Sequence, residues 1–197
     1  LIYDSLKLDE SKVNIAVLHG QIAGYNSTDK SELISLPALK NKNIDYLALG
    51  HIHYYDKKPL DDRGVYCYSG CLDGRGFDEL GEHGFSLIEI NGGRVESSFV
   101  KFSSRCFHEF IYDVSNVKSF YEARSEILSA LLKTCDNVDL IKVILKGEHD
   151  ADFEIDKDAL VSYLQESFFF VKVYDRTELK INIEDYATDK SVRGEFV

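Results

Sequence analysis

The segment "DYLALGHIHYY" (residues 45–55) joins an apolar run to a glycine and then to two histidines, His51 and His53, on either side of one isoleucine. The apolar run predicts a buried strand, and open α/β sheets carry their functional residues just beyond the carboxyl ends of such strands. If the backbone stays extended through "GHIH", both histidines project to the same side, roughly 6.5 to 7 Å apart. The segment therefore predicts either a pair of metal ligands or two polar residues where a strand leaves the core.

A second segment of this kind lies upstream, where "KVNIAVLHG" (12–20) predicts another buried strand that ends at His19. Between the two strands, "SELISLPALKNKN" (31–43) has the apolar spacing of a helix that Pro37 begins or bends. Strand, helix and strand predict a βαβ unit with parallel strands, which brings all three histidines to one edge of a sheet. Imidazoles bind ions such as Zn and Mn, and two such ions lie about 3.5 to 4 Å apart in hydrolytic centres.

Carboxylates are the weak part of this metal-site prediction. A hydrolytic metal pair needs carboxylates to bridge and neutralise the ions, yet none in residues 1–105 stands at the carboxyl end of a predicted strand. Asp45 lies at the opposite end of its strand. Arg75, in "DGRGFD", is a candidate substrate-binding residue, and the alternative is that it fixes its own loop by pairing with Asp73 or Asp78.

Short strands punctuated by glycine follow up to residue 105: "GVYCYSG", "GFSLIEI" and "RVESSFVKF". "EINGGRVE" predicts a tight hairpin, because Asn and Gly tolerate the positive φ angles of such turns. We therefore expect an antiparallel sheet added to the parallel one, and a first domain over residues 1–105 of the α/β class.

Residues 106–197 predict a small α+β domain. "CFHEFIYDV", "VDLIKVILKG" and "FFFVKVYDRT" have the pattern of strands, and "DKDALVSYLQES" that of a helix. "NVKSFYEARSEILSALLKTC" predicts a longer amphipathic helix whose apolar face comprises Phe120, Ile127, Leu128, Leu131 and Leu132. The tail from Glu178 onward is polar and weakly patterned.

Composition narrows the protein class further. The chain has no apolar run long enough to span a membrane and no signal peptide, so we expect a cytoplasmic protein without a membrane partner. Its four cysteines lack a CxxC pair and are expected to be free thiols. The formal net charge of −11 argues against nucleic-acid binding by broad electrostatic attraction. A chain that starts at Leu1 and contains no methionine is expected to be a fragment or a processed form.

These segments together resemble the second half of a calcineurin-like metallophosphoesterase, specifically the SbcD-type and YhaO-like DNA repair exonucleases. The resemblance rests on "LHG", "LGHIH" and "VYCYSGCLDGRGFDELGEHGFSLIEI", and on "DLIKVILKG" and "VYDRTELKI…VRGEFV" in the second domain. It implies the carboxyl-terminal part of an αββα sandwich over 1–105 and an α+β capping domain over 106–197. Ser69 and His83 depart from the family, where proline and lysine are usual, which leaves the substrate contacts of this loop open.

Carried over to this sequence, the resemblance implies that His19 and His51 bind one divalent metal ion, expected to be Mn²⁺, and that His53 binds the other. The family's D-x-H, G-D and G-N-H-D motifs have no counterpart here, so we expect the catalytic residues upstream of Leu1 and the 197-residue chain by itself to be inactive. The implied partners are DNA and an SbcC-like ATPase, and a homodimer is a further assembly to test.

Two alternative functions remain open from the sequence. One is a metallophosphoesterase for small phosphoesters, with the second domain shaping a narrow pocket. The other is a non-catalytic fragment that serves structure or association.

Overall fold

The computed structural model describes residues 3, 5–23 and 33–180. The chain divides into two compact units, Leu1–Phe107 and His108–Val197, whereas the sequence placed the boundary after residue 105. None of the helices in these described ranges has the length and apolarity needed to cross a lipid bilayer. All four cysteines lie in the described ranges and form no disulfide, as predicted.

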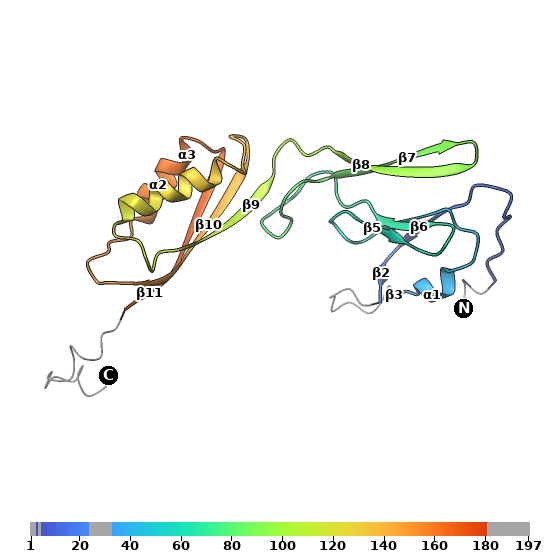
Figure 1. Cartoon of the computed structure of the whole chain (residues 1–197), viewed down its shortest axis with the longest axis horizontal. Coiled ribbons are helices and arrows are strands. Elements are labelled where there is room, and N and C mark those ends of the chain that lie inside the picture. The colour runs from blue at the N-terminus through green and yellow to red at the C-terminus, as the bar shows by residue number, and fades with distance from the viewer. Residues whose placement is uncertain (1–2, 4, 24–32, 181–197) are drawn as a thin grey trace, which may run out of the picture. The chain divides into compact units, whose positions relative to one another are not determined.

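A four-stranded sheet forms the centre of the first unit (Figure 1). Its strands, in spatial order, are β1 (Ile15–His19), β4 (Tyr46–Gly50), β6 (Val65–Tyr68) and β5 (Asp56–Pro59). β1 pairs with β4 and β4 pairs with β6 in parallel, while β5 runs antiparallel to β6. The predicted parallel pairing of the two histidine-terminated strands is therefore confirmed.

The two histidine-terminated strands differ in burial. β4 lies inside the sheet, and its Leu47 and Leu49 are buried in the core. β1 lies at the edge, and Ile15 and Val17 on it are 43% and 75% exposed. The prediction that β1 is a buried strand was wrong, because only one face of this edge strand is covered, and the alternate side chains on that face are no more than half-buried.

The connection between β1 and β4 contains far less helix than predicted. Its elements are β2 (Gln21–Ile22), β3 (Leu33–Ile34) and α1 (Leu36–Leu39). The predicted helix over 31–43 was therefore wrong for most of its length, and residues 31 and 32 lie outside the described ranges. Parallel pairing between β3 and β2 holds the backbone extended up to Ile34. Pro37 then occupies the first turn of α1, and the helix ends before Asn41, whose φ of 59° is left-handed.

The predicted hairpin is confirmed as β7 (Gly84–Asn91) and β8 (Arg94–Lys101). Asn91 pairs with Arg94, and the two loop glycines have φ angles of 58° and 85°, as a type I′ turn requires. The hairpin is a separate two-stranded sheet rather than an addition to the parallel one. Side chains join it to the larger sheet, since the Tyr46 hydroxyl donates to Ser86 Oγ at 2.8 Å.

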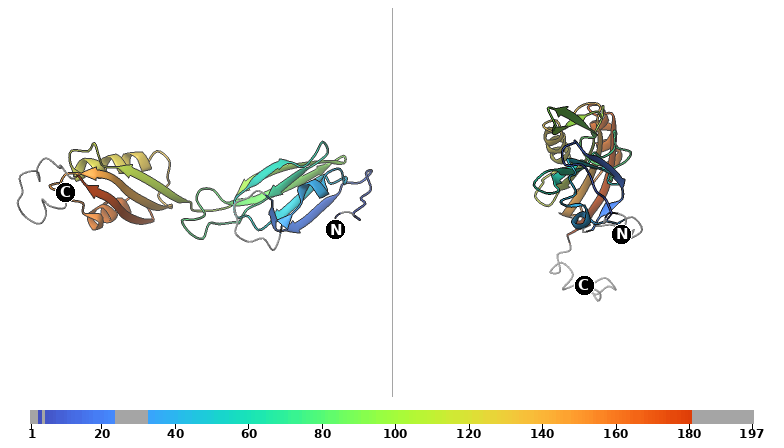
Figure 2. Two further views of the ribbon diagram at one scale, coloured as in Figure 1. Left: turned by 90° about the horizontal axis from the view of Figure 1, so that it is seen from below. Right: turned by 90° about the vertical axis from the view of Figure 1, so that its right-hand side faces the viewer.

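All five predicted elements of the second unit are confirmed. They are β9 (Phe107–Asp113), α2 (Phe120–Leu131), β10 (Leu140–His149), α3 (Lys157–Gln165) and β11 (Phe170–Leu179). The strands form a sheet of order β11-β10-β9, in which β10 and β11 are parallel (Figure 2). Most of the predicted tail lies outside the described ranges.

Both helices of the second unit pack on one face of its sheet. Alternate β10 residues, Ile141, Val143 and Leu145, form a buried core with Ile127 of α2 and Leu160 of α3. Caps start both helices: the side chain of Ser119 accepts from the Glu122 N–H, and that of Asp156 accepts from the Ala159 N–H. Of the predicted apolar face of α2, only Leu132 was wrong, because it lies just past the helix and is 58% exposed.

Candidate metal centre

The ends of β1 and β4 bring two of the predicted ligands together. The parallel register pairs His19 with Gly50, so the next residue, His51, lies beside His19. Their ring centroids are 5.6 Å apart, and the ring planes are nearly perpendicular at 88°. Two imidazoles from neighbouring strands thus face each other at the carboxyl edge of the sheet, where α/β folds place their chemistry.

Gly50 makes this approach possible. A Cβ atom on residue 50 would lie 2.7 Å from His19 Nδ1 and 3.4 Å from its Cε1, so the imidazole occupies the space that a side chain would need. The following residue, His51, has a φ of 103° and turns the chain away from the strand. The condition of an extended "GHIH" backbone is therefore not met, and β4 ends at Gly50.

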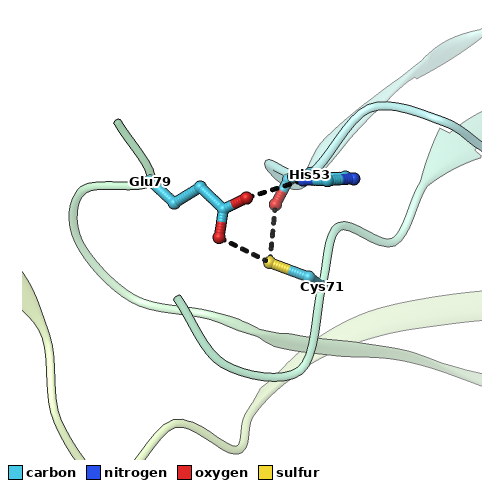
Figure 3. Close-up of side chains that lie close together, drawn as sticks. All are labelled: His53, Cys71 and Glu79. Carbon is cyan, nitrogen blue, oxygen red and sulfur yellow. Dashed lines mark hydrogen bonds and ion pairs between the residues drawn. The ribbon is translucent and has the colours of Figure 1, made fainter. Parts of the chain in front are cut away.

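His53 belongs to a different set of contacts, formed with two loop residues, Cys71 and Glu79 (Figure 3). His53 Nδ1 lies 2.7 Å from Glu79 Oε1. Arg75 binds the same carboxylate twice, through Nη2 to Oε1 at 2.9 Å and through its backbone N–H to Oε2 at 2.8 Å. Arg75 Nη2 is also 2.8 Å from His53 Nδ1. We call His53, Cys71, Arg75 and Glu79 the loop cluster, and His19 with His51 the strand-end pair.

Glu79 is the charged centre of the loop cluster. Hydrogen bonds from Arg75 and then from His53 lower the pKa of Glu79 to about 2, so its carboxylate is ionised at neutral pH. The same ion pair raises the pKa of Arg75. The alternative prediction that Arg75 pairs with Asp73 or Asp78 was wrong, because its ion pair is with Glu79.

Cys71 holds the loop against the His53 backbone. Its N–H donates to the His53 carbonyl at 3.1 Å, and its Sγ lies 3.4 Å from the same oxygen and 3.2 Å from Nδ1 of the buried His83. Gly70, with a φ of 77°, allows this approach, since a Cβ there would lie 3.0 Å from the His53 carbonyl oxygen. Burial raises the pKa of the Cys71 thiol, and the neighbouring Glu79 adds to the rise. The sulfur is therefore a neutral thiol at neutral pH.

Sequence reasoning missed Glu79 and Cys71. It considered only carboxylates at strand ends, whereas Glu79 lies in a loop 26 residues beyond His53. A signal was present in "GRGFDELG", where a carboxylate stands in a loop between glycines that permit tight turns.

The ligand atoms of His53, Cys71 and Glu79 all lie within 4.8 Å of one another, so their spacing could hold a metal ion. Within the described ranges, no such three-residue group includes His19 or His51. Two imidazoles suit Zn, Mn or Fe as donors, and they leave further coordination positions for other ligands. The strand-end pair therefore fits a divalent metal ion as a partial ligand set.

No family model matches the chain. Over 141 residues, 70% of this chain, the sequence is 24% identical to a protein of Bacillus subtilis (strain 168) named "Uncharacterized metallophosphoesterase YhaO". The match covers 34% of that protein, so the chain corresponds to about a third of its length. The similarity supports a place in the metallophosphoesterase superfamily, and the mixed α/β architecture of the chain is consistent with the fold of that superfamily.

Proposed function

We propose that the chain is part of a metal-dependent DNA repair exonuclease of the SbcD type, which hydrolyses DNA phosphodiester bonds at a two-metal centre. The observation that carries the proposal is the strand-end pair, with His19 and His51 5.6 Å apart at the ends of neighbouring parallel strands. The similarity to a metallophosphoesterase supports hydrolysis of a phosphoester as the chemistry.

In this proposal His19 and His51 bind one ion, His53 binds the other, and both ions are Mn²⁺. Bound divalent ions would supply Lewis acidity and an activated water for attack on phosphorus. The residues of this chain orient that centre: the sheet sets the spacing of the strand-end pair, and Glu79 holds the His53 ring through Nδ1. Arg75 is proposed to contact substrate, because its side chain is 70% exposed beside His53 and guanidinium groups bind phosphate well.

The proposed partners follow from the same function. Since the chain carries a formal charge of −11, DNA would be held locally, by the metal ions and Arg75, rather than over a wide basic surface. An SbcC-like ATPase is the proposed protein partner, in the cytoplasm, and a homodimer is the proposed assembly of the intact protein.

Nuclease assays test the proposal on a full-length protein that contains this chain, here called the extended protein. We expect Mn²⁺-dependent digestion of linear DNA, and its loss in His51→Ala and His53→Ala. Glu82→Ala is the matched control, because Glu82 is 60% exposed and pairs with Lys101 in the same region. Hydrolysis of small phosphodiesters without DNA digestion would favour the alternative substrate class. If the protein shows neither DNA digestion nor hydrolysis of small phosphodiesters, both enzymatic functions are refuted.

A calorimetric titration of the 197-residue chain with Mn²⁺ tests the alternative of a non-catalytic fragment. We expect weak binding, because neutral imidazoles without bridging carboxylates hold a metal pair poorly. Tight binding of two ions per chain would contradict this expectation and show that the chain by itself contains a complete centre.

A further inference from the structure

His53 Nδ1 has two close polar neighbours of opposite character. Glu79 Oε1 lies 2.7 Å away, and Arg75 Nη2 lies 2.8 Å away. A carboxylate can only accept a hydrogen bond, and a guanidinium can only donate one. A single ring nitrogen cannot satisfy both neighbours, so the two contacts correspond to two tautomers of the neutral imidazole.

In the first tautomer Nδ1 carries the proton and donates it to Glu79, which leaves the Nε2 lone pair available to a metal ion. In the second tautomer Nδ1 accepts from Arg75, and Nε2 carries the proton. The second form cannot bind a metal through Nε2. The choice between Glu79 and Arg75 thus decides whether the outward nitrogen of His53 is a ligand.

The hydrogen bonds favour the first tautomer. Glu79 Oε1 has two lone pairs, so it can accept from His53 Nδ1 and from Arg75 Nη2, which is 2.9 Å away. Both bonds are then charge-assisted, and Arg75 gives up its 2.8 Å contact with Nδ1 but keeps its bond to Oε1. In the second tautomer Oε1 would face the Nδ1 lone pair at 2.7 Å, which is repulsive.

We propose that Glu79 is a positioning residue that fixes His53 as the Nδ1–H tautomer and so presents Nε2 as the metal-binding atom. Arg75 acts through Glu79, because it anchors the carboxylate from its side chain and from its backbone N–H. Glu79 is only 9% exposed, whereas His53 is 48% exposed. The positioning carboxylate is therefore largely buried, and the imidazole ring remains accessible to a metal ion. Figure 3 shows one ring nitrogen facing Glu79 and the other directed away from it. The inference rests on the proposed metal chemistry.

Nitrogen-15 NMR of the imidazoles reports the tautomer directly, on the 197-residue chain without metal. The ring signals of His53 are assigned as those missing in His53→Ala, at a pH where the ring is neutral. We expect Nδ1 to give a protonated-nitrogen shift and Nε2 an unprotonated one. The opposite pattern in the wild type would overturn the proposal.

Two variants separate positioning from a structural role of Glu79. Glu79→Gln keeps the size of the side chain, but its amide can also donate to Nδ1, so we expect a mixture of tautomers in a chain that still unfolds cooperatively. Glu79→Ala is expected to move His53 largely to the Nε2–H form. Glu82→Ala is the control and should leave the His53 shifts as they are. Wild-type shifts in both Glu79 variants would show that the carboxylate only shapes the loop.

Metal affinity is the second readout. In the extended protein, loss of the Glu79 carboxylate in Glu79→Ala should weaken Mn²⁺ binding by about 10- to 100-fold. Loss of a hydrogen-bond partner of a metal-binding histidine typically has an effect of this size. Unchanged affinity in Glu79→Ala would overturn the assignment. If the wild type shows the Nδ1–H tautomer but the extended protein digests no DNA, the proposed function fails while the positioning of His53 stands.

Discussion

The strand-end pair and the loop cluster each contain one histidine of "GHIH", His51 and His53, yet different interactions hold the two sets of residues in place. His19 and His51 are placed by the register of β1 and β4 above the apolar core of the first unit. His53 is placed by charge-assisted hydrogen bonds to residues of a loop. The comparison shows that adjacent candidate ligands can depend on separate parts of the fold, on core packing in one case and on an ionic network in the other.

Leu47→Ala should affect the molecule most and should act on the strand-end pair. Leu47 of β4 is fully buried, and truncating such a leucine costs about 2–5 kcal/mol of unfolding free energy through lost burial and the cavity left behind. Urea unfolding measures this loss. Val17→Ala on neighbouring β1 is the control, expected to change stability by about 0.5 kcal/mol or less because Val17 is 75% exposed. Equal losses in the two variants would contradict the described core.

Asp45→Asn should have the next largest effect, at the amino end of β4. Asp45 accepts from Arg63 Nε at 2.9 Å and Nη2 at 3.0 Å, and from the Asn14 N–H at 2.8 Å. Burial acts to raise the pKa of Asp45, but the bonds from Arg63 and Asn14 outweigh it and lower the pKa. We expect a loss of about 1–3 kcal/mol, typical of hydrogen bonds to a charged group. A variant as stable as the wild type in urea would show that the hydrogen bonds of Asp45 with Arg63 and Asn14 do not stabilise the amino end of β4.

Glu79→Gln should lower the unfolding free energy at neutral pH and remove the pH dependence that Glu79 contributes, and it tests the loop cluster. The pKa of Glu79 falls from 4.5 to about 2 on folding. Its contribution is therefore fully present above pH 4.5 and is lost as the pH falls toward 2. Urea unfolding between pH 2 and 5 should show that wild type and variant converge as the pH falls within this window. A constant difference would mean that the carboxylate does not titrate as the ion pair requires.

Cys71→Ser should have the smallest effect. The raised pKa keeps the thiol neutral, and the backbone N–H of residue 71 still bonds to the His53 carbonyl. We expect a change in unfolding free energy below about 1 kcal/mol, as for the loss of a weak hydrogen bond. A larger loss of unfolding free energy, measured in the same urea experiment, would show that Cys71 contributes to the stability of the loop cluster as Glu79 does.

The sequence predicted the strand-end pair because two local patterns were enough. Apolar runs ending in histidine predict parallel strands, and parallel strands share an edge, so His19 and His51 had to lie near each other. The five elements of the second unit were predicted for a similar reason, since each has its own apolar period and sits beside clear turns.

The loop cluster could not be predicted in this way, because no periodic pattern links His53 to Glu79. Their contact depends on the course of the intervening loop, including the left-handed backbone at Gly70. The helix predicted over 31–43 failed for a related reason. Pairing between β3 and β2 is a tertiary contact, and it overrode the local helical spacing before Pro37.

Gly50 leads to an expectation about mutational tolerance. It offers no side-chain atom to a metal ion, yet the imidazole of His19 fills the volume that any larger residue would require. If residue 50 were randomised and variants were selected for metal binding, we expect glycine to dominate the survivors as strongly as histidine would at position 51. A map of mutational tolerance for this chain would therefore rank Gly50 with the ligands, although its only contribution is to leave room for the His19 imidazole.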